Sequence, residues 1–532
     1  MPRLPDPVVF AIGAEVDESR VARWLAGAEP AGPARTVEQA LLDTFDGRLY
    51  RRGLVMWREG SRRAPSLRLQ QAGAADLSGR VESGDPDRIL VADLPEGVLN
   101  DRLADLIGER ALQPRVRIRT RTRPWRVCNG DGKTVVRMAV EEPAVVGGRG
   151  VEADLGRRLR VVPVLGYPRD MERAVAALER RLEHQPMPLA EAALAAAGVR
   201  PEGVSSDVEV PLVPEMRADI AIAAICRRLA EIVDDHKAGV VADIDPEFLH
   251  DMRVAVRRSR AVLKEMRGVL TPEQAARARS DLKWIQEITG PTRDLDVLLH
   301  EWPSMVEPVP TWMGPDLGPL LDLLRRERAE AYSTMRRHLT SRRFAAAWSA
   351  WQELIAESAP TGSAPTGSAP IGPSFAGPSF AGPEAGRPIG ELAGRRIVAV
   401  YRSMARAGAA IDDDSPPEAL HDLRKRGKEL RYLLELFGCM WPEERVKPLV
   451  GALKGLQDVL GHFQDDEIQA LELRGLGPVL AATPGGTDSL IALGFVIEEL
   501  TRRQHQARAD FATRFSDFAA PANRKRVTGT FR

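Results

Sequence analysis

Histidine, arginine and lysine residues recur in this chain at a spacing that suits the binding of an anion. The segment 249–253 (Leu-His-Asp-Met-Arg) returns at 420–424 (Leu-His-Asp-Leu-Arg), and the Leu-Lys pair at 282–283 returns at 453–454. Both matches have the same offset of 171 residues, from 421 − 250 and 453 − 282. Two blocks in one register indicate an internal duplication. What is duplicated is a histidine followed by a basic helix.

The basic residues of each copy would form one stripe along a helix, because they recur at intervals of three or four positions. The first stripe holds His250, Arg253, Arg257, Arg260 and Lys264, and the second holds His421, Arg424, Lys428 and Arg431. Like charges at such spacings destabilise an isolated helix by roughly some tenths of a kcal/mol per pair. Carboxylates that could neutralise the stripes are scarce, since Glu265 and Glu429 lie off their lines. We therefore expect an anion to bind there, and the alternative is a solvated basic face.

Composition limits the classes of protein to consider. At 532 residues the chain is expected to form two or three domains. Its 75 basic and 75 acidic residues give a formal net charge of zero, so only local clusters of charge can attract an anionic partner. Cys128, Cys226 and Cys439 are far apart, which argues against a disulfide framework or a Cys-rich zinc site and fits a reducing cytoplasm. The short apolar run at 8–12 predicts neither a signal peptide nor a membrane span.

Residues 1–190 are predicted to form an α+β domain, followed by a linker over 191–213. Alternation and turn residues predict strands at 8–12, 48–57, 115–123 and 159–164, helices at 18–25 and 171–182, and a hairpin around 129–132. In the strand at 115–123, five arginines alternate with other residues and therefore share one face. These arginines could bind an anion, or they could keep an exposed edge strand soluble.

Helical periodicity replaces the strands from residue 214 onward. The first copy of the repeat occupies 214–357, the second occupies 390–520, and a basic tail follows at 521–532. The stretch 358–389 repeats Ser-Ala-Pro-Thr-Gly and Gly-Pro-Ser-Phe-Ala, and such a low-complexity segment is not expected to pack in a core. Each copy is therefore predicted to be a self-contained set of helices, joined to the other by a flexible tether.

Three short motifs follow one another in the first copy. They are His-x-x-Arg-x-x-x-Arg-Arg-x-Arg from His250, Leu-Lys-x-x-Gln from Leu282 and Thr-Arg-Asp-Leu-Asp-Val from Thr292. Together they resemble the CHAD family, the histidine-containing α-helical domains, over about 214–520. The resemblance implies an all-α domain of two four-helix repeats related by a pseudo-twofold axis. It also implies that the basic helices line a central cleft that binds inorganic polyphosphate.

The resemblance assigns a set of basic residues to polyphosphate binding. They are His250, Arg253, Arg257, Arg258, Arg260, Lys264, Lys283, His421, Arg424, Lys425, Lys428, Arg431 and Lys454. The second copy departs from the motif, because Lys428 and Glu429 stand where the first copy has Arg257 and Arg258. This departure predicts a weaker half-site in the second copy.

The chemistry of the stripes favours a phosphate polymer over nucleic acid. Polyphosphate presents many acceptor oxygens and no bases, so it is bound by rows of Arg and Lys rather than by aromatic platforms. The stripes lack interleaved Phe or Tyr, which disfavours single-stranded nucleic acid. A scaffold that binds protein or nucleic acid is the second alternative. No membrane partner is expected, and the sequence does not determine the oligomeric state. The predicted location is the cytoplasm, where association with polyphosphate granules is compatible with this function.

Asp294 and Asp296 could form a metal site, but carboxylates at a helical turn more often pair with an arginine. We therefore predict no metal site in the helical domain.

The N-terminal domain carries a second resemblance. The segments 42–49 (Leu-Asp-Thr-Phe-Asp-Gly-Arg-Leu) and 53–58 (Gly-Leu-Val-Met-Trp-Arg) resemble the second-strand region of the CYTH triphosphatases. The resemblance implies a β-barrel tunnel in which basic residues bind a triphosphate and glutamates hold a divalent metal. It also assigns Arg117, Arg119 and Arg121 as residues that could face phosphate. CYTH domains are often fused to CHAD domains.

The residues that a CYTH enzyme needs for its metal are missing here. The strand at 8–12 has no carboxylate, and Arg160 stands where acidic ligands are expected. Glu141 and Glu142 alone are too few to hold a divalent cation against a triphosphate. We therefore predict a degenerate CYTH-like domain with no catalytic residues, and a protein that is not an enzyme and needs no cofactor. The main alternative is a CYTH-type metal-dependent triphosphatase or polyphosphatase.

Overall fold

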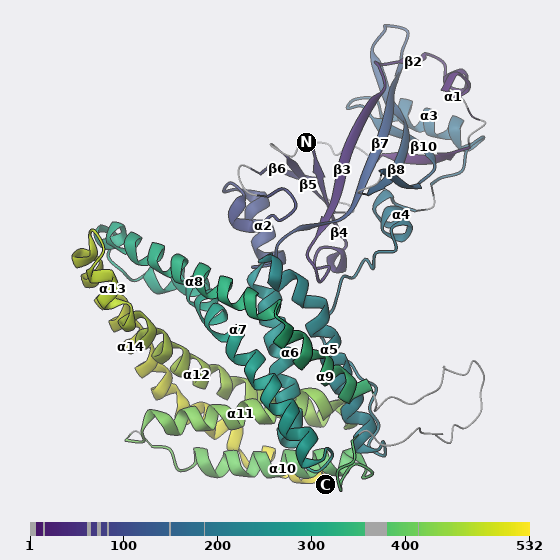
Figure 1. The fold of residues 1–532 in the computed structure, drawn as a ribbon. Coiled ribbons are helices and arrows are strands. Elements are labelled where there is room, and N and C mark those ends of the chain that lie inside the picture. Colours follow the sequence, from purple (N-terminus) through teal and green to yellow (C-terminus); the bar gives the residue numbers. More distant parts are fainter. Residues whose placement is uncertain are drawn as a thin grey trace. The chain divides into compact units, whose positions relative to one another are not determined.

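The structure, a computed structural model, describes residues 7–13, 16, 18–60, 65–71, 76–81, 85–147, 150–185, 187–356, 380–412 and 414–531. The chain divides into two compact units, Met1–Ser205 and Ser206–Arg532, and each is described by itself. The first contains the strands and the second is helical (Figure 1). Most of the predicted low-complexity stretch at 358–389 lies outside the described residues.

The first unit is an antiparallel sheet with short helices. Its path is β1 (Val8–Ile12), β10 (Arg157–Pro163), β8 (Thr134–Gly147), β7 (Gln113–Cys128), β3 (Arg35–Asp43), β4 (Leu54–Glu59), β5 (Ser66–Gln71) and β6 (Leu77–Arg80). Off this path, β2 (Ala28–Pro30) pairs with β7 and β9 (Gly150–Asp154) pairs with β8. The helices are α1 (Glu18–Trp24), α2 (Val98–Ile107), α3 (Pro168–Glu179) and α4 (Leu189–Ala196). Because β1 and β6 are the two ends of the described path, the closed barrel stays a prediction.

The arginine-rich strand β7 lies inside the sheet, between β3 and β8. The alternative that it is an exposed edge strand is therefore wrong. Its alternation is as predicted, because Val116, Ile118 and Thr120 are buried between the arginines. The hairpin is also confirmed, since β7 and β8 are adjacent and antiparallel on either side of the turn at 129–133.

Two other predictions for the first unit need correction. The strand expected at 48–57 begins only at Leu54, because Tyr50–Arg52 forms a 3-10 turn, and the preceding strand β3 was not predicted. The interval 191–213, predicted as a linker, begins inside α4. Ala193 and Leu194 of that helix are buried against the sheet, so the first unit extends to Ser205.

The helical unit repeats its helices at the offset found in the sequence. The first copy contains α5 (Ala218–Ala242), α6 (Pro246–Glu265), α7 (Pro272–Val306), α8 (Gly318–Leu339) and α9 (Arg342–Ala356). The second contains α10 (Ile389–Gly408), α11 (Pro417–Phe437), α12 (Glu443–Gly475), α13 (Gly477–Ala481), α14 (Gly486–Ala519) and α15 (Pro521–Thr530). The starts of α10, α11 and α12 follow those of α5, α6 and α7 by 171 residues (389 − 218, 417 − 246 and 443 − 272). Each copy thus holds more than the four helices that were expected.

Local signals explain where the site-bearing helix α6 begins. Pro246 occupies its first turn, and the carboxylate of Asp245 accepts hydrogen bonds from the backbone N–H groups of Glu247 and Phe248 at 3.0 and 3.2 Å. The next helix, α7, is capped by Thr271 and Gln274, which exchange side-chain and backbone hydrogen bonds.

Within the described ranges, no helix combines the length and the apolar character needed to cross a bilayer.

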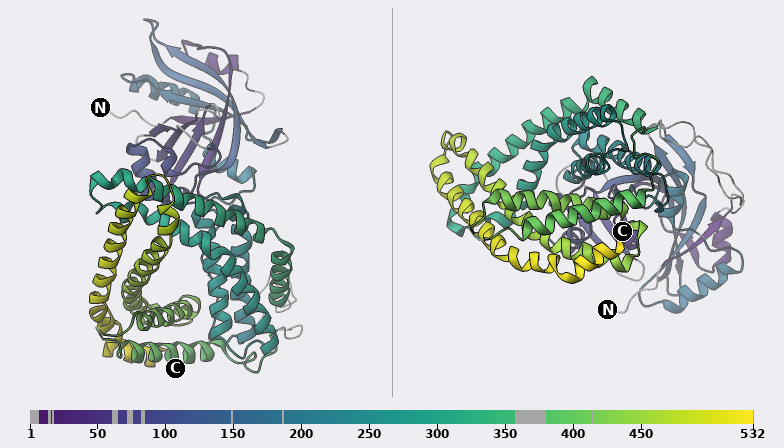
Figure 2. Two further views of the ribbon diagram at one scale, coloured as in Figure 1. Left: turned by 60° about the vertical axis from the view of Figure 1, so that its left-hand side comes forward. Right: turned by 90° about the horizontal axis from the view of Figure 1, so that it is seen from below.

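The two copies are not self-contained sets of helices, contrary to the prediction. One hydrophobic core joins α7 and α8 of the first copy to α12, α13 and α14 of the second. The long helices α12 and α14, yellow-green in Figure 2, run side by side. This packing makes one domain of the two copies, because neither could bury these apolar faces alone.

The low-complexity stretch, predicted to stay outside the core, and the predicted basic tail both contribute buried residues. The described end of the low-complexity stretch buries Phe380 fully, and the backbone N–H of Gly382 donates to the carbonyl oxygen of Val269 at 3.0 Å. The expected basic tail is the helix α15, in which Val527 is fully buried. Single apolar residues in these polar segments supply the contacts, and composition averages conceal them.

Candidate functional site

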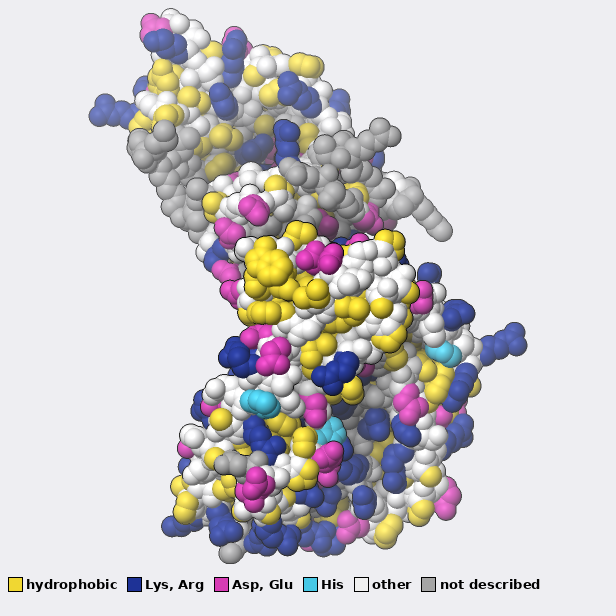
Figure 3. Space-filling view, turned by 90° about the vertical axis from the view of Figure 1, so that its left-hand side faces the viewer, with side chains coloured by type: hydrophobic (Ala, Val, Ile, Leu, Met, Phe, Trp, Pro, Cys, Tyr) yellow, Lys and Arg dark blue, Asp and Glu magenta, His cyan; other side chains and the backbone are white. Residues whose placement is uncertain are grey.

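Helices α6 and α11 line a common cavity of about 420 Å³. Its lining includes five predicted polyphosphate residues, His250, Arg257 and Arg258 from α6 and Lys428 and Arg431 from α11. The other lining residues are Ser206, Asp207, Ile232, Asp251, Val254, Ala255, Tyr432 and Glu435. Figure 3 shows Lys and Arg side chains gathered around a hollow in the helical unit, with His side chains nearby. Side chains from both copies of the repeat therefore line one cavity.

Arg257 and Lys428 are cations of this cavity that form no ion pair with a described carboxylate, although the charge of Asp465 acts on Lys428. They occupy equivalent positions in the two copies, since 428 − 257 is 171. Across the part of the chain that the structure describes, neither forms an ion pair, and Nε of Arg257 is buried without a hydrogen-bond partner. Two unpaired cations in a partly buried cavity need an anion or water to solvate them.

Burial and like charges shift two titrating side chains of the cavity toward their neutral forms. The pKa of Lys428 is lowered to about 8, first by burial and then by the nearby Arg424 and Arg257. The pKa of His250 is also lowered, by burial and by the charge of Arg293. A bound anion would oppose both shifts, because a negative charge favours the protonated forms. Anion binding in this cavity is therefore expected to take up protons.

Two ion pairs join α6 to α11 in a reciprocal pattern. Arg258 donates from Nη2 to Oε2 of Glu435 at 2.8 Å, and Nζ of Lys264 pairs with Glu429. Adding the offset of 171 to 258 gives 429, and adding it to 264 gives 435. Arg258 thus contacts the second-copy equivalent of position 264, and Lys264 contacts the second-copy equivalent of position 258. This reciprocal arrangement is the pattern of an interface between two identical units related by a twofold axis. Here two basic residues of the first copy face two acidic residues of the second.

Glu435 also pairs with a cation of its own helix. Nε of Arg431 donates to Oε1 of Glu435 at 2.5 Å, and this hydrogen bond raises the pKa of Arg431. The expectation that carboxylates do not neutralise the stripes is therefore wrong for Lys264, Arg424 and Arg431, and Arg258 beside the first stripe is also paired. Helical spacing within one copy did not show this, because the second copy supplies the carboxylates for both Arg258 and Lys264.

The equivalent residues Arg253 and Arg424 are directed to the long helices rather than to the cavity. Nη1 of Arg253 donates to the carbonyl oxygen of Gln286 and to Oγ1 of Thr289, each at 2.8 Å. Burial lowers the pKa of Arg253 to about 10. Nη2 of Arg424 donates to Oδ1 of Asp465 on α12 at 2.7 Å. Both arginines join a stripe helix to the following helix, and their contact with polyphosphate stays a prediction.

The remaining predicted polyphosphate residues are also outside the cavity lining. Three pair with carboxylates, Lys264 with Glu429, Lys283 with Glu287 and Lys425 with Asp422. Nδ1 of His421 hydrogen-bonds Oε1 of Gln464. Arg260 is half-buried and Lys454 is exposed, and neither has an ion pair with another described residue. The stripes as predicted are thus longer than the cavity.

Sequence reasoning missed a buried network beside the cavity. Ser206 donates its hydroxyl to Oδ2 of Asp251 at 2.7 Å and lies 3.2 Å from Nε2 of His236. His236 is fully buried, and its Nδ1–H donates to the carbonyl oxygen of Ile232 at 2.7 Å. Asp251 is therefore engaged by neighbouring side chains. Ser206 lies in a Pro-rich boundary segment, and nothing in the spacing of that segment indicates a role.

Asp296 of α7 joins neighbouring helices through an arginine. Oδ1 of Asp296 accepts a hydrogen bond from Nε of Arg328 at 2.8 Å, and Arg328 also binds Asp243 through Nη2 at 2.6 Å. This contact confirms the predicted arginine-pairing role for Asp296. Of the residues that the structure describes, no three or more His, Cys, Asp or Glu side chains are grouped in a way that could hold a metal ion.

In the first unit, Arg117 lines an open cavity of about 700 Å³. It pairs with Asp87 at 2.7 Å. Although burial acts to raise it, hydrogen bonds from Arg117 and Arg58 lower the pKa of Asp87 to about 2. The other two arginines predicted to face phosphate do not line this cavity, since Arg119 pairs with Glu38 at 2.8 Å and Arg121 pairs with Glu142 at 3.7 Å.

Glu141 and Glu142 of the first unit do not fit a divalent metal. Glu141 is buried, and its Oε1 accepts a hydrogen bond from Nε of Arg160 at 2.7 Å. Glu142 lies 3.3 Å from Nε of Arg157. Because arginines already neutralise both carboxylates, a cation would have to displace them.

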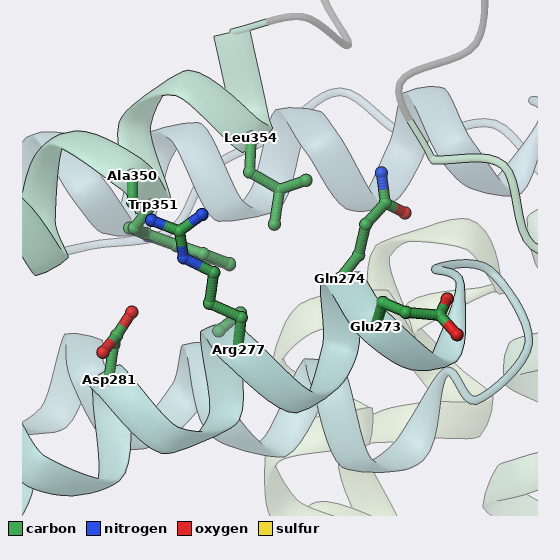
Figure 4. Close-up of a pocket in the computed structure, with 8 residues that line it drawn as sticks. Glu273, Gln274, Arg277, Asp281, Ala350, Trp351 and Leu354 are labelled. Carbon is green, nitrogen blue, oxygen red and sulfur yellow. The ribbon is translucent and has the colours of Figure 1, made fainter.

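A smaller cavity of about 260 Å³ lies between α7 and α9 (Figure 4). It is lined by Glu273, Gln274, Arg277, Ala278, Asp281, Ala350, Trp351 and Leu354. One arginine against two carboxylates gives this lining no excess of positive charge. It is therefore a poorer site for a polyanion than the cavity between α6 and α11.

Known proteins are similar to parts of this chain. The uncharacterized proteins Rv2226 and MT2285, from two strains of Mycobacterium tuberculosis, are each 25% identical to it over 330 residues, or 61% of this chain and 56% of the relative. The chain thus spans about half the length of the curated relatives it matches. The crystal structure of the CHAD domain from the plant Ricinus communis has 22% identity and a TM-score of 0.47, and covers 59% of this chain and 96% of that one. PptA from Streptomyces chartreusis has 15% identity and a TM-score of 0.41, and the match covers 57% of this chain and 100% of PptA.

The sequence model of the CHAD domain family matches residues 223–474. This range begins in α5 and ends in α12, so it includes both stripe helices and the cavity cations Arg257 and Lys428. The match confirms the resemblance that rested on the histidine and arginine motifs. The helical unit of this chain therefore contains a CHAD domain.

Proposed function

We propose that the protein binds inorganic polyphosphate in the cavity between α6 and α11, without hydrolysing it. The observation that carries the proposal is the pair Arg257 and Lys428, which brings unpaired positive charge from both copies of the repeat to one cavity. Phosphate polymers offer closely spaced anionic oxygens, and Arg and Lys bind such oxygens through charge-assisted hydrogen bonds. The CHAD domain supports the same ligand, because this family is linked to polyphosphate in general.

The cavity suits an anion without bases better than it suits nucleic acid. Tyr432 is the one aromatic side chain among the described lining residues, and it is buried at 9% exposure. Single-stranded nucleic acid gains much of its affinity by stacking bases on exposed aromatic rings. A single-stranded oligonucleotide should therefore compete only weakly with polyphosphate for this protein.

The decisive experiment incubates the full chain with long-chain polyphosphate, with and without Mg²⁺ or Mn²⁺. Isothermal titration measures binding, and a phosphate assay measures release. We expect binding in both conditions and no release above a buffer control. Metal-dependent release that is lost in Glu141→Gln or Glu142→Gln would instead support the triphosphatase alternative.

A matched pair of double variants tests the position of the site. Arg257→Ala with Lys428→Ala removes two cavity cations at equivalent positions and should weaken binding strongly. Lys283→Ala with Lys454→Ala also removes two positive charges at equivalent positions (454 − 283 = 171), but these lysines are exposed and outside the cavity lining. Their loss should weaken binding much less. Equal losses would mean that general surface charge, rather than the cavity, attracts the polymer.

A further inference from the structure

The contacts of Glu435 support a further inference, which rests on the proposed function. Its carboxylate accepts one hydrogen bond from each copy of the repeat, from Nη2 of Arg258 at 2.8 Å and from Nε of Arg431 at 2.5 Å. All three side chains line the cavity. The side chains of Glu435 and Arg258 are only 25% and 20% exposed, so water screens their contact incompletely. An anionic group held between two arginines is also the arrangement that would bind one phosphate group.

We infer that Glu435 is an internal competitor for polyphosphate, and that it determines which anions can bind. While its two oxygens hold Arg258 and Arg431, Glu435 neutralises part of their charge and occupies one N–H donor of each, so less charge and fewer donors remain for phosphate oxygens. Two of the four Lys and Arg side chains of the cavity thus pair with Glu435, and the other two, Arg257 and Lys428, form no ion pair with any residue that the structure describes.

The competition discriminates by the length of the anion. A single phosphate group that takes Arg258 and Arg431 exchanges one anion for another, and it leaves the displaced carboxylate nearby as a like charge. A longer polymer binds Arg257 and Lys428 with other phosphate groups at the same time, which raises the effective concentration of the group that displaces Glu435. Glu435 should therefore reject orthophosphate and short polyphosphates more strongly than long chains.

Glu429 provides a matched control within the same helix. It is the other carboxylate of the reciprocal pattern, since it pairs with Lys264, but it does not line the cavity. Glu429→Gln and Glu435→Gln each remove one negative charge from α11, at positions six residues apart (435 − 429). A difference between them therefore reports the position of the carboxylate and not the net charge of the helix.

The test is isothermal titration of the full-length wild type, E435Q and E429Q with orthophosphate, tripolyphosphate and long-chain polyphosphate. E435Q should bind tripolyphosphate roughly tenfold more tightly than the wild type, which is the effect expected for about one charge-assisted hydrogen bond. The gain should be smaller for the long polymer. Because two more guanidinium groups become available, the slope of log K against log salt should steepen by about one to two units. E429Q should stay within about twofold of the wild type on the same reasoning.

Distinct outcomes separate this inference from the proposed function. If the wild type binds polyphosphate and R257A weakens it, but E435Q binds no more tightly than the wild type, Glu435 is not a competitor. Equal tightening in E429Q and E435Q also overturns the inference, because a general charge effect explains it. If E435Q does not fold by circular dichroism, E435A removes the same two oxygens and is held to the same expectation. A wild type that binds no polyphosphate overturns the proposed function, and this inference with it.

Discussion

The helices α6 and α11 derive from one repeated motif, yet they bring different charges to the interface between them. Helix α6 provides Arg258 and Lys264, and the equivalent positions of α11 provide Glu429 and Glu435. In the folded domain these four residues pair across the two copies. The sequence difference that predicted a weaker second half-site is therefore also a difference that complements the first copy.

This comparison indicates that duplication can separate two functions of one helix, the binding of an anion and the pairing of the two copies. With identical copies, the reciprocal pattern would place Arg258 opposite a second basic residue, and like charges would oppose the association. The acidic residues of α11 remove that repulsion and favour pairing of the first copy with the second. The cost is that fewer cations of α11 remain unpaired, so α6 is expected to supply more of the anion affinity.

The largest effect should come from removing the stripe of α6. Replacing Arg253, Arg257 and Arg260 by Ala should weaken polyphosphate binding by roughly tenfold or more, with most of the loss from Arg257, which lines the cavity, and flatten the salt slope by about one unit for each lost contact. The physical reason is the loss of charge-assisted hydrogen bonds and of displaced counterions. Titration at several salt concentrations measures both quantities.

The equivalent triple variant of α11 sharpens the comparison. Replacing Arg424, Lys428 and Arg431 by Ala should weaken binding less, because Asp465 and Glu435 already neutralise two of these cations. Circular dichroism should show both variants folded. Wild-type affinity and salt slope in both would mean that the stripes are only a solvated basic face, and a larger loss in the α11 variant would reverse the assigned roles.

The next effect concerns stability rather than binding. Changing Glu429 and Glu435 to Arg makes α11 resemble α6. It should lower the free energy of unfolding by about 1–2 kcal/mol for the partly buried pair of Arg258 and Glu435, and by less for Lys264 and Glu429, because Lys264 is exposed to water. Chemical denaturation of the full chain measures this loss. Adding Arg258→Glu and Lys264→Glu restores opposite charges and should recover most of it.

The control for this charge reversal is a second pair of glutamates. Changing the exposed Glu443 and Glu444 at the start of α12 to Arg alters the net charge equally, away from the interface. A similar loss in the control, or no recovery in the fourfold variant, would show that the reciprocal pairs do not specify how the copies associate.

A smaller effect follows from the pKa of Lys428, which is about 8 in the free protein. A bound polyanion raises this pKa, so affinity should be constant below about pH 8 and fall by a few fold as pH rises through it. Lys428→Arg should extend the plateau to higher pH, because arginine stays charged there. Since burial lowers the pKa of His250, any tightening on acidification should begin below the usual range of histidine. Titrations across pH in one buffer series decide this, and a wild type and K428R with the same profile would contradict it.

How much the sequence could predict depended on whether a feature was local. The offset of 171 residues predicted the equivalence of the stripe helices, and the structure extends it to the helices on either side. Helical periodicity is set by neighbours along the chain, so it can be read from the residues themselves. The strand at 115–123 was predictable for the same reason, but its place inside the sheet depends on β3 and β8, which pair from elsewhere in the chain.

The composition of the cavity was not local, and it was predicted only in part. Five of its basic residues were named, but Ser206 comes from a segment between domains, and Arg258 meets Glu435 across 177 residues. Glu435 had one visible signal, its position four residues after Arg431 on the same helix. The sign reversal at Glu429 was visible too. Its meaning required the knowledge that equivalent helices face each other.

The smallest effect distinguishes two equivalent arginines, Arg260 and Arg431 (431 − 260 = 171). Arg431 lines the cavity and holds Glu435, whereas Arg260 lies outside the cavity lining. Arg431→Ala should weaken binding by roughly threefold, because it removes one cation and leaves the negative charge of Glu435 less neutralised inside the cavity. Arg260→Ala should change affinity by less than about twofold. Titration of the two single variants with the same long-chain polyphosphate compares them directly. If Arg260→Ala weakens binding as much as Arg431→Ala, the polymer must leave the cavity and follow the whole stripe of α6, as the spacing in the sequence first indicated.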